Sequence, residues 1–115
     1  MVCQSMSRIK YSQAAARKLD SIHHYISETL RSPRAATRVV KSIIERINTL
    51  KESPFIGPRL SSRIDGVPER FSETRYLVCD RHIVIYEPGK TGVSILAIYH
   101  STEDTFGRVL SELDE

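Results

Sequence analysis

The residues with the greatest chemical capacity lie in the second half of the chain. Histidine has a pKa of about 6.5 and exchanges protons near neutral pH, while arginine binds phosphate and carboxylate oxygens through paired N–H groups. The candidate site residues are Arg75, Arg81, His82, Tyr86, Tyr99, His100 and Asp104. These residue types could act as a general acid or base, or bind a phosphate or an acidic surface.

Each candidate also has a purely structural interpretation. Arginines at strand ends, such as Arg75 and Arg81, are commonly solvated. His100 precedes Asp104 by one helical turn, and a hydrogen bond between them would fix the corner between a strand and a helix. Tyr86 has the bulk of a core aromatic. Residue types alone leave catalysis, binding and packing open.

Three apolar runs rich in β-branched residues position these candidates. They predict strands over residues 75–79, 81–86 and 93–99, joined near Asp80 and by the Pro- and Gly-containing turn 88–92. Short connections make neighbouring strands antiparallel, so we expect a three-stranded meander.

Side chains alternate between the two faces of a strand. His82, Val84 and Tyr86 should therefore share one face. In the last strand, alternation places Leu96, Ile98 and His100 opposite Ile95, Ala97 and Tyr99. Which face meets the helices stays open at this point.

The first half of the chain predicts a strand and two helices. Residues 8–11 form a short strand, and Ser12 is suited to cap the helix that follows. That helix carries an apolar stripe at steps of three and four, namely Ala15, Leu19, Ile22, Ile26 and Leu30. Ser32 and Pro33 start a second amphipathic helix, which ends before Pro54.

These elements predict an α+β fold. An N-terminal strand is followed by an antiparallel αα-hairpin, a loop over residues 53–69, the meander and a short C-terminal helix over residues 102–112. We expect residues 1–7 to be a flexible N-terminal extension and residues 8–115 to be a single domain.

Composition sets further bounds. The chain has 115 residues and 17 Lys and Arg against 14 Asp and Glu. The resulting net charge of +3 favours a polyanion or an acidic partner, but it is too small to prove nucleic-acid binding. Cys3 and Cys79 are two isolated cysteines, so we expect free thiols, no metal site and no cofactor. With no signal-peptide pattern and no long apolar span, we expect a cytoplasmic protein that does not enter the membrane.

The order and spacing of several motifs resemble the RelE/ParE superfamily, the toxin half of bacterial type II toxin–antitoxin pairs. The resemblance covers nearly all of residues 8–113. It rests on Ile9-Lys10-Tyr11, Ile22-x-x-Tyr25-Ile26, Leu50-x-x-x-Pro54-x-x-Gly57, the run 81–86 and the run 95–104.

The two branches of this superfamily imply different activities. RelE-like members resemble ribosome-dependent mRNA endonucleases, and a YoeB-like variant has a terminal histidine in cleavage. For this chain, that branch implies His100 and Tyr99 as catalytic residues with Arg75 or Arg81 as the cation. However, Ile83 and Ser101 stand where the RelE branch has arginines.

ParE-like members have a histidine or aromatic residue before the apolar run, as at His82, and a histidine four residues before an aspartate, as at His100 and Asp104. The resemblance therefore favours a ParE-like toxin that arrests growth by binding DNA gyrase and trapping its cleaved-DNA state, a role associated with plasmid stabilisation. The implied target-binding residues are Arg75, Arg81, His82, Tyr86, His100 and Asp104.

The resemblance also implies a cognate antitoxin. A disordered antitoxin segment would fold across the hairpin and add a strand beside residues 93–99 or beside the first strand. Operator DNA would be contacted only through the antitoxin. A third interpretation is an inactive toxin that serves as an antitoxin-bound co-repressor.

Overall fold

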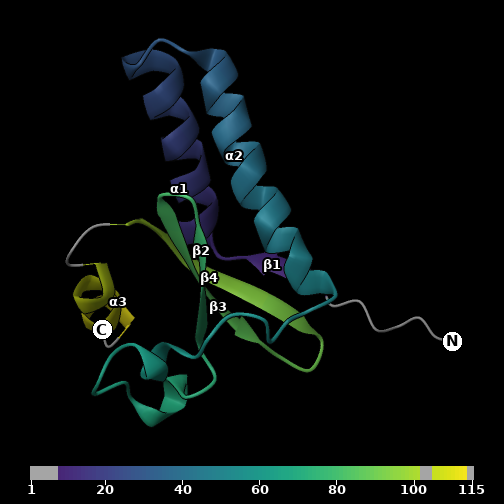
Figure 1. Ribbon diagram of the computed structural model, residues 1–115, viewed down its shortest axis with the longest axis vertical. Helices are drawn as coiled ribbons and strands as arrows, with labels where there is room; N and C mark the ends of the chain where they lie inside the picture. The colour runs from purple at the N-terminus through teal and green to yellow at the C-terminus, as the bar shows by residue number, and fades with distance from the viewer. Residues whose placement is uncertain (1–7, 102–104, 114–115) are drawn as a thin grey trace, which may run out of the picture.

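The computed structural model describes residues 8–101 and 105–113, and it has the α+β architecture predicted from the sequence (Figure 1). The regular elements are β1 (Arg8–Tyr11), α1 (Gln13–His24), a π-helical turn (Tyr25–Thr29), α2 (Pro33–Asn48), β2 (Arg75–Cys79), β3 (His82–Pro88), β4 (Gly92–His100) and α3 (Thr105–Leu113). Three short 3-10 turns lie at Thr49–Lys51, Leu60–Ser62 and Glu69–Phe71. Within the described residues, no helix is long and apolar enough to cross a membrane.

The sheet has the strand order β1-β4-β3-β2. The predicted meander is confirmed, because β2 pairs with β3 and β3 with β4 in antiparallel fashion. β1 pairs with β4 in parallel, with Arg8 opposite Gly92 and Tyr11 opposite Ile95. The suggestion that residues 93–99 offer a free edge is therefore wrong for residues 93–95, which pair with β1; within the described residues, no strand pairs with residues 96–99 on that side. β1 and β2 are the edge strands.

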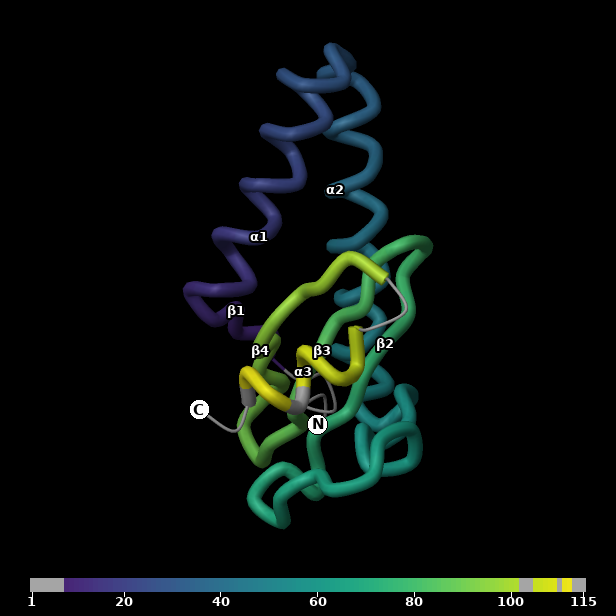
Figure 2. The backbone as a smooth tube through the Cα atoms, turned by 90° about the vertical axis from the view of Figure 1, so that its left-hand side faces the viewer, coloured from purple at the N-terminus to yellow at the C-terminus, as the bar shows by residue number. Residues whose placement is uncertain are grey.

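Both faces of the sheet are covered (Figures 1 and 2). The α1–α2 hairpin packs on one face, where the core includes Ile22, Ile43, Ile47, Val84 and Tyr86. α3 and the loop after α2 pack on the other face, where the core includes Leu60, Ile83, Ile85 and Val109. The face of β3 that meets the hairpin is thus the one carrying His82, Val84 and Tyr86.

A β-bulge in β4 changes the predicted alternation. The register shifts between Ile85 and Tyr86, which pair with Ala97 and Ile95, so Leu96 is an extra residue. Ile95 and Ile98 consequently both face the hairpin, whereas Leu96, Ala97 and Tyr99 face α3. The predicted grouping of Leu96 with Ile98 is wrong for this reason.

Ser12 joins the bulge to the start of α1. Its hydroxyl accepts a hydrogen bond from the Ala15 amide, as expected of a helix cap. The same hydroxyl donates to the Leu96 carbonyl oxygen at 2.8 Å, and the Ser12 amide donates to the Ile95 carbonyl oxygen. One serine therefore fixes the helix, the bulge and the β1–β4 pair together.

The hairpin extends beyond the sheet (Figure 1). Ala15 and Ile22 of the predicted stripe are buried, but Leu30 is 57% exposed because it lies near the hairpin tip, where no strand covers it. The helix also widens into the π-helical turn before this tip, and Arg31 then adopts a positive φ of 56°. The stripe prediction holds for the part of α1 above the sheet and is wrong for Leu30.

Candidate functional site

The candidate residues named from the sequence occupy three separate places. Arg81, His82 and His100 lie at one end of the sheet, which we call the histidine end. Arg75 and Tyr86 lie at the other end of the same face. Tyr99 lies on the opposite face.

At the histidine end, two strands bring two imidazoles together. His82 pairs with His100 across β3 and β4, and their rings meet edge to face with centroids 5.4 Å apart. His82 is 9% exposed, whereas His100 and Arg81 are exposed. Arg81 belongs to the β2–β3 turn rather than to the strand, and its carbonyl oxygen accepts from the Ser101 amide.

The charges at this end have few partners. Burial lowers the pKa of His82, and the neighbouring His100 and Lys18 lower it further, while Asp80 raises it slightly. Within residues 8–101 and 105–113, neither the Arg81 nor the His100 side chain makes a hydrogen bond or an ion pair. No third His, Cys, Asp or Glu of the described residues completes a metal-binding group. This end is therefore positively charged and available to an anionic partner.

At the opposite end, the candidates hold the loop that follows α2. The Arg75 guanidinium donates to the carbonyl oxygens of Gly57 at 2.6 Å and Phe55 at 3.3 Å, and it lies over the Phe55 ring. The Tyr86 hydroxyl accepts from the Gly57 amide at 2.9 Å. Tyr86 is 0% exposed, so it has no surface with which to contact a target in this structure.

Tyr99 joins β4 to α3. Its hydroxyl donates to a Glu112 carboxylate oxygen at 2.6 Å. Burial raises the pKa of the phenol, and the bond to Glu112 raises it further, so Tyr99 stays protonated. Asp104, the remaining candidate, and the predicted helix start at Thr102 lie outside the described residues.

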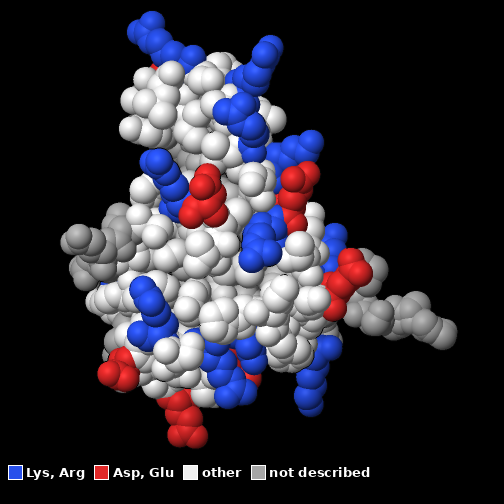
Figure 3. All heavy atoms as spheres, viewed as in Figure 1, with Lys and Arg blue, Asp and Glu red and all other residues white. Residues whose placement is uncertain are grey.

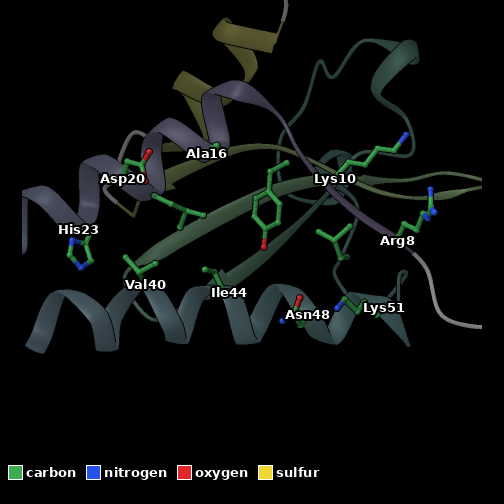
Figure 4. Close-up of a pocket in the computed structure, with 12 residues that line it drawn as sticks. Arg8, Lys10, Ala16, Asp20, His23, Val40, Ile44, Asn48 and Lys51 are labelled. Carbon is green, nitrogen blue, oxygen red and sulfur yellow. The ribbon is translucent and has the colours of Figure 1, made fainter.

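A groove between β1 and the hairpin was not predicted from the sequence (Figure 4). It has a volume of about 1070 Å³. Figure 4 shows Val40 and Ile44 projecting from α2 on one side, Ala16 and Asp20 on α1 opposite them, and Arg8 and Lys10 at the β1 end. Its floor is apolar and its rim is mostly basic. In the sequence, the signal for this groove is the two extra apolar residues Val40 and Ile44, which widen the apolar stripe of α2. In the structure they are half-exposed beside the buried part of that stripe.

Basic side chains do not gather into one patch on the face shown in Figure 3. Blue Lys and Arg groups are spread from the hairpin tip to the lower loops, with red acidic groups between them. This distribution agrees with the net charge of +3 and does not resemble a surface that follows a nucleic-acid backbone.

Residues 9–105 match the family model described as the ParE toxin of the type II toxin–antitoxin system parDE. The match starts in β1 and ends at the first residue of α3, so it includes both ends of the sheet.

Two solved structures share the fold. A chain of the chromosomal ParDE toxin–antitoxin system from P. aeruginosa has a TM-score of 0.63 and 22% identity, covering 86% of this chain and 100% of that chain. A chain of the RelBE2 toxin–antitoxin complex from Mycobacterium tuberculosis has a TM-score of 0.57 and 16% identity, covering 84% of this chain and 99% of that chain. A search of curated proteins finds no match.

Proposed function

Because this chain belongs to the ParE toxin family of type II toxin–antitoxin systems, we propose that it arrests growth in the cytoplasm by binding DNA gyrase and trapping the cleaved-DNA state. In this proposal the histidine end supplies the target contacts, with Arg81 and His100 at the surface. The mechanism is binding, and the chain performs no chemical step.

The observation that carries this proposal is the separation of Tyr99 from His100; of the two candidate cations, Arg81 lies at the histidine end with His100, whereas Arg75 does not. A phosphodiester cleavage site needs its base, acid and cation around one reacting phosphate. Tyr99 and His100 leave β4 on opposite faces. Arg75 pairs with Tyr86, four residues along β3 from the His82–His100 pair, which is about 13 Å at the rise of a strand.

A cognate antitoxin fits the groove between β1 and the hairpin. A partly disordered partner segment would bury apolar side chains against Val40 and Ile44, and acidic side chains would meet Arg8, Lys10 and Lys51. β1 is an edge strand, so a partner strand can also pair beside it. Of the two strand-addition sites suggested by the sequence, we keep only β1.

The test of the gyrase target is a supercoiling and DNA-cleavage assay with purified gyrase, run beside a ribosome-bound mRNA cleavage assay. We expect linear DNA to accumulate and the mRNA to stay intact. Arg81→Glu combined with His100→Gln should reduce DNA trapping at least about tenfold, because a rim charge reversal at an interface costs both attraction and steering.

The control for this test is Lys90→Glu, which makes the same charge reversal at the exposed β3–β4 turn. It should leave DNA trapping within about twofold of that of the unmodified protein, as expected of an exposed charge outside the interface. Unaffected gyrase together with codon-phased cuts in the mRNA would overturn the proposal and establish the endonuclease alternative.

The antitoxin groove is tested by the affinity of the purified cognate antitoxin. Ile44→Glu places a charge on the apolar floor and should weaken binding at least about tenfold. Arg38→Glu, on an exposed part of α2 outside the groove, is the matched control. Equal affinities of the two variants would contradict this placement.

A further inference from the structure

A second cavity lies between the histidine end and the part of the hairpin that extends beyond the sheet. Its volume is about 490 Å³, within the range of about 300–1,000 Å³ typical of small-molecule sites. α1, the π-helical turn and α2 form one wall, and the β2–β3 turn with the ends of β3 and β4 forms the other. The proposed gyrase contacts Arg81 and His100 line its sheet side, but the proposed function leaves its apolar wall unassigned, and the antitoxin groove shares none of its lining residues.

The hairpin wall is apolar and incompletely covered. Ile22 is buried, and Ile26 and Val39 are partly buried against the main core. Tyr25 and Leu30 also line this wall, and they are 54% and 57% exposed. Large apolar side chains exposed around a concavity mark a place where an apolar group can bind.

The sheet wall is polar and mostly basic. Arg81, His82 and His100 line it together with one acidic residue, Asp80, and Lys18 of α1 adds a further cation from the hairpin side. Neither Lys18 nor Arg81 has an ion-pair partner within residues 8–101 and 105–113. The buried His82 is faced by Lys18 from α1, His100 from β4 and Asp80 from the turn. This arrangement disfavours a further positive charge and favours an anion.

Unusual backbone conformations border the cavity on both sides. The π-helical turn Tyr25–Thr29 widens the hairpin wall, and such turns are frequent at functional sites. On the sheet side, Asp80 has a positive φ of 57°, an uncommon conformation for a residue other than glycine. Both irregularities orient residues that line the cavity, namely Tyr25, Ile26 and Asp80.

We propose that this cavity binds a small organic anion, with an aromatic or short alkyl body against the hairpin wall and a single carboxylate between Lys18 and the two histidines. The apolar wall is too extensive for a ligand that consists of charged phosphate groups alone. The volume holds one compact molecule, which favours a free metabolite-sized carboxylate over a protein segment.

The probe for this proposal is 4-phenylbutyrate, with 4-phenylbutanamide as its uncharged counterpart. Calorimetry gives the two affinities, and nitrogen and carbon NMR shifts of the histidine rings locate the ligand. We expect the carboxylate to bind about tenfold more tightly than the amide near pH 6, because the anion is attracted to Lys18 and Arg81 and stabilises the protonated form of His82. Near pH 8 the difference should shrink to about threefold, because burial, His100 and Lys18 lower the pKa of His82 and the anion then gains nothing from its protonation.

Three variants test the charged and the apolar contacts of the ligand separately. Lys18→Met should weaken the affinity for the carboxylate about fivefold and leave the affinity for the amide unchanged. Leu30→Ser, at an exposed position that tolerates substitution, should weaken both ligands by a similar factor of about three. Lys90→Met, far from the cavity, is the control and should change neither affinity.

Several results would overturn this inference. These are equal affinities for carboxylate and amide, ring shifts that miss His82 and His100, or no binding up to the solubility limit. Tighter binding of the peptide acetyl-Phe-Leu-Glu-amide than of 4-phenylbutyrate would assign the cavity to a partner protein and also overturn it. The measurements contain neither gyrase nor antitoxin, so their failure is distinct from failure of the proposed function.

Discussion

The two ends of the hairpin-facing side of the sheet carry similar residue types and use them in opposite ways. At one end, the side chains of Arg75 and Tyr86 form hydrogen bonds with the backbone of the loop around Gly57. At the other end, Arg81 and His100 make no side-chain hydrogen bond within residues 8–101 and 105–113. An arginine and an aromatic ring at a strand end can thus hold a loop in place or stay available to a partner. We call the contacts of Arg75 and Tyr86 with the Gly57 loop the clamp.

The difference follows from what lies opposite each end. The loop after α2 returns to β2, where the Leu60 amide donates to the Thr74 carbonyl oxygen and the Tyr76 amide donates to the Pro58 carbonyl oxygen. This loop supplies carbonyl and amide partners that would otherwise be unsatisfied. The histidine end faces the overhanging hairpin, which offers an apolar wall and no such partners. Polar side chains there remain available to a ligand.

The largest expected effect is at the clamp itself. In Gly57→Ala, the new Cβ would collide with the Tyr76 carbonyl oxygen and lie 2.7 Å from the Tyr86 hydroxyl. We expect the free energy of unfolding to fall by about 2–3 kcal/mol, through overpacking and the lost hydrogen bond. Urea unfolding measures this change. Ser61→Ala, at an exposed site in the same loop, is the control and should leave the free energy of unfolding nearly unchanged. An unchanged free energy of unfolding for Gly57→Ala would show that the clamp does not stabilise the fold.

A paired substitution compares the two arginines directly. Arg75→Ala removes two bonds to backbone carbonyls and should destabilise the fold by about 1–2 kcal/mol. Arg81→Ala should change the free energy of unfolding by less than about 0.5 kcal/mol. In the gyrase assay the order should reverse, with Arg81→Ala losing more DNA trapping than Arg75→Ala at equal folded fraction. The same order in both assays would remove the distinction between the two ends.

Tyr99→Phe tests the other face of the sheet, which α3 covers and to which we assign no target contact. Loss of the bond to the partly exposed Glu112 should cost about 0.5–1 kcal/mol, seen as a lower thermal midpoint. Growth arrest in cells should persist, because Tyr99 lies on the α3 side of the sheet. Abolished growth arrest with the fold intact would instead point to a catalytic tyrosine.

The smallest expected effect is a pH dependence at the histidine end. Burial, with the charges of His100 and Lys18, lowers the pKa of His82 below its ordinary value of about 6.5 in the unfolded chain. Between these two pKa values the unfolded state binds the extra proton, so stability falls as the pH decreases through this window. His82→Gln should lose part of the stability difference between pH 7.5 and pH 5.5, two test values on either side of about 6.5. His24→Gln, on the exposed part of α1, should retain the whole difference.

Local features were predictable from the sequence because their causes are local. Ser12 and Ser32 cap the two helices by accepting bonds from the Ala15 and Ala35 amides, as their residue type indicates. Pro33 begins α2, and the meander follows from the short connections between its strands. Each of these predictions depends on residues close together in the chain.

Features set by distant contacts could not be predicted. The pairing of β1 with β4 joins the first and last strands, and no sequence pattern specifies it. The bulge at Leu96 depends on the Ser12 hydroxyl, which is 84 positions away. Both sheet faces carry apolar residues because both are covered, so alternation did not reveal which one met the hairpin.

The sequence predicted which residue types belong to the candidate site, but not which of those residues lie together. The cross-strand pair of His82 and His100 was predictable from the antiparallel pairing of β3 and β4, since the two residues occupy the strand ends away from the connecting turn. The structural role of Arg75 and Tyr86 depends on the path of the loop through Gly57, where proline and glycine leave no regular period to follow.

The parallel pairing of β1 with β4 also has a consequence for synthesis of the chain. The hairpin contains mostly local contacts and can form as soon as about residue 50 has emerged, since helices fold rapidly. β1 has no strand to pair with until residues 92–95 are available, so the sheet closes late. During that interval the edge of β1 and the apolar side of the hairpin are both uncovered. A newly made molecule therefore exposes these surfaces before it has completed the fold.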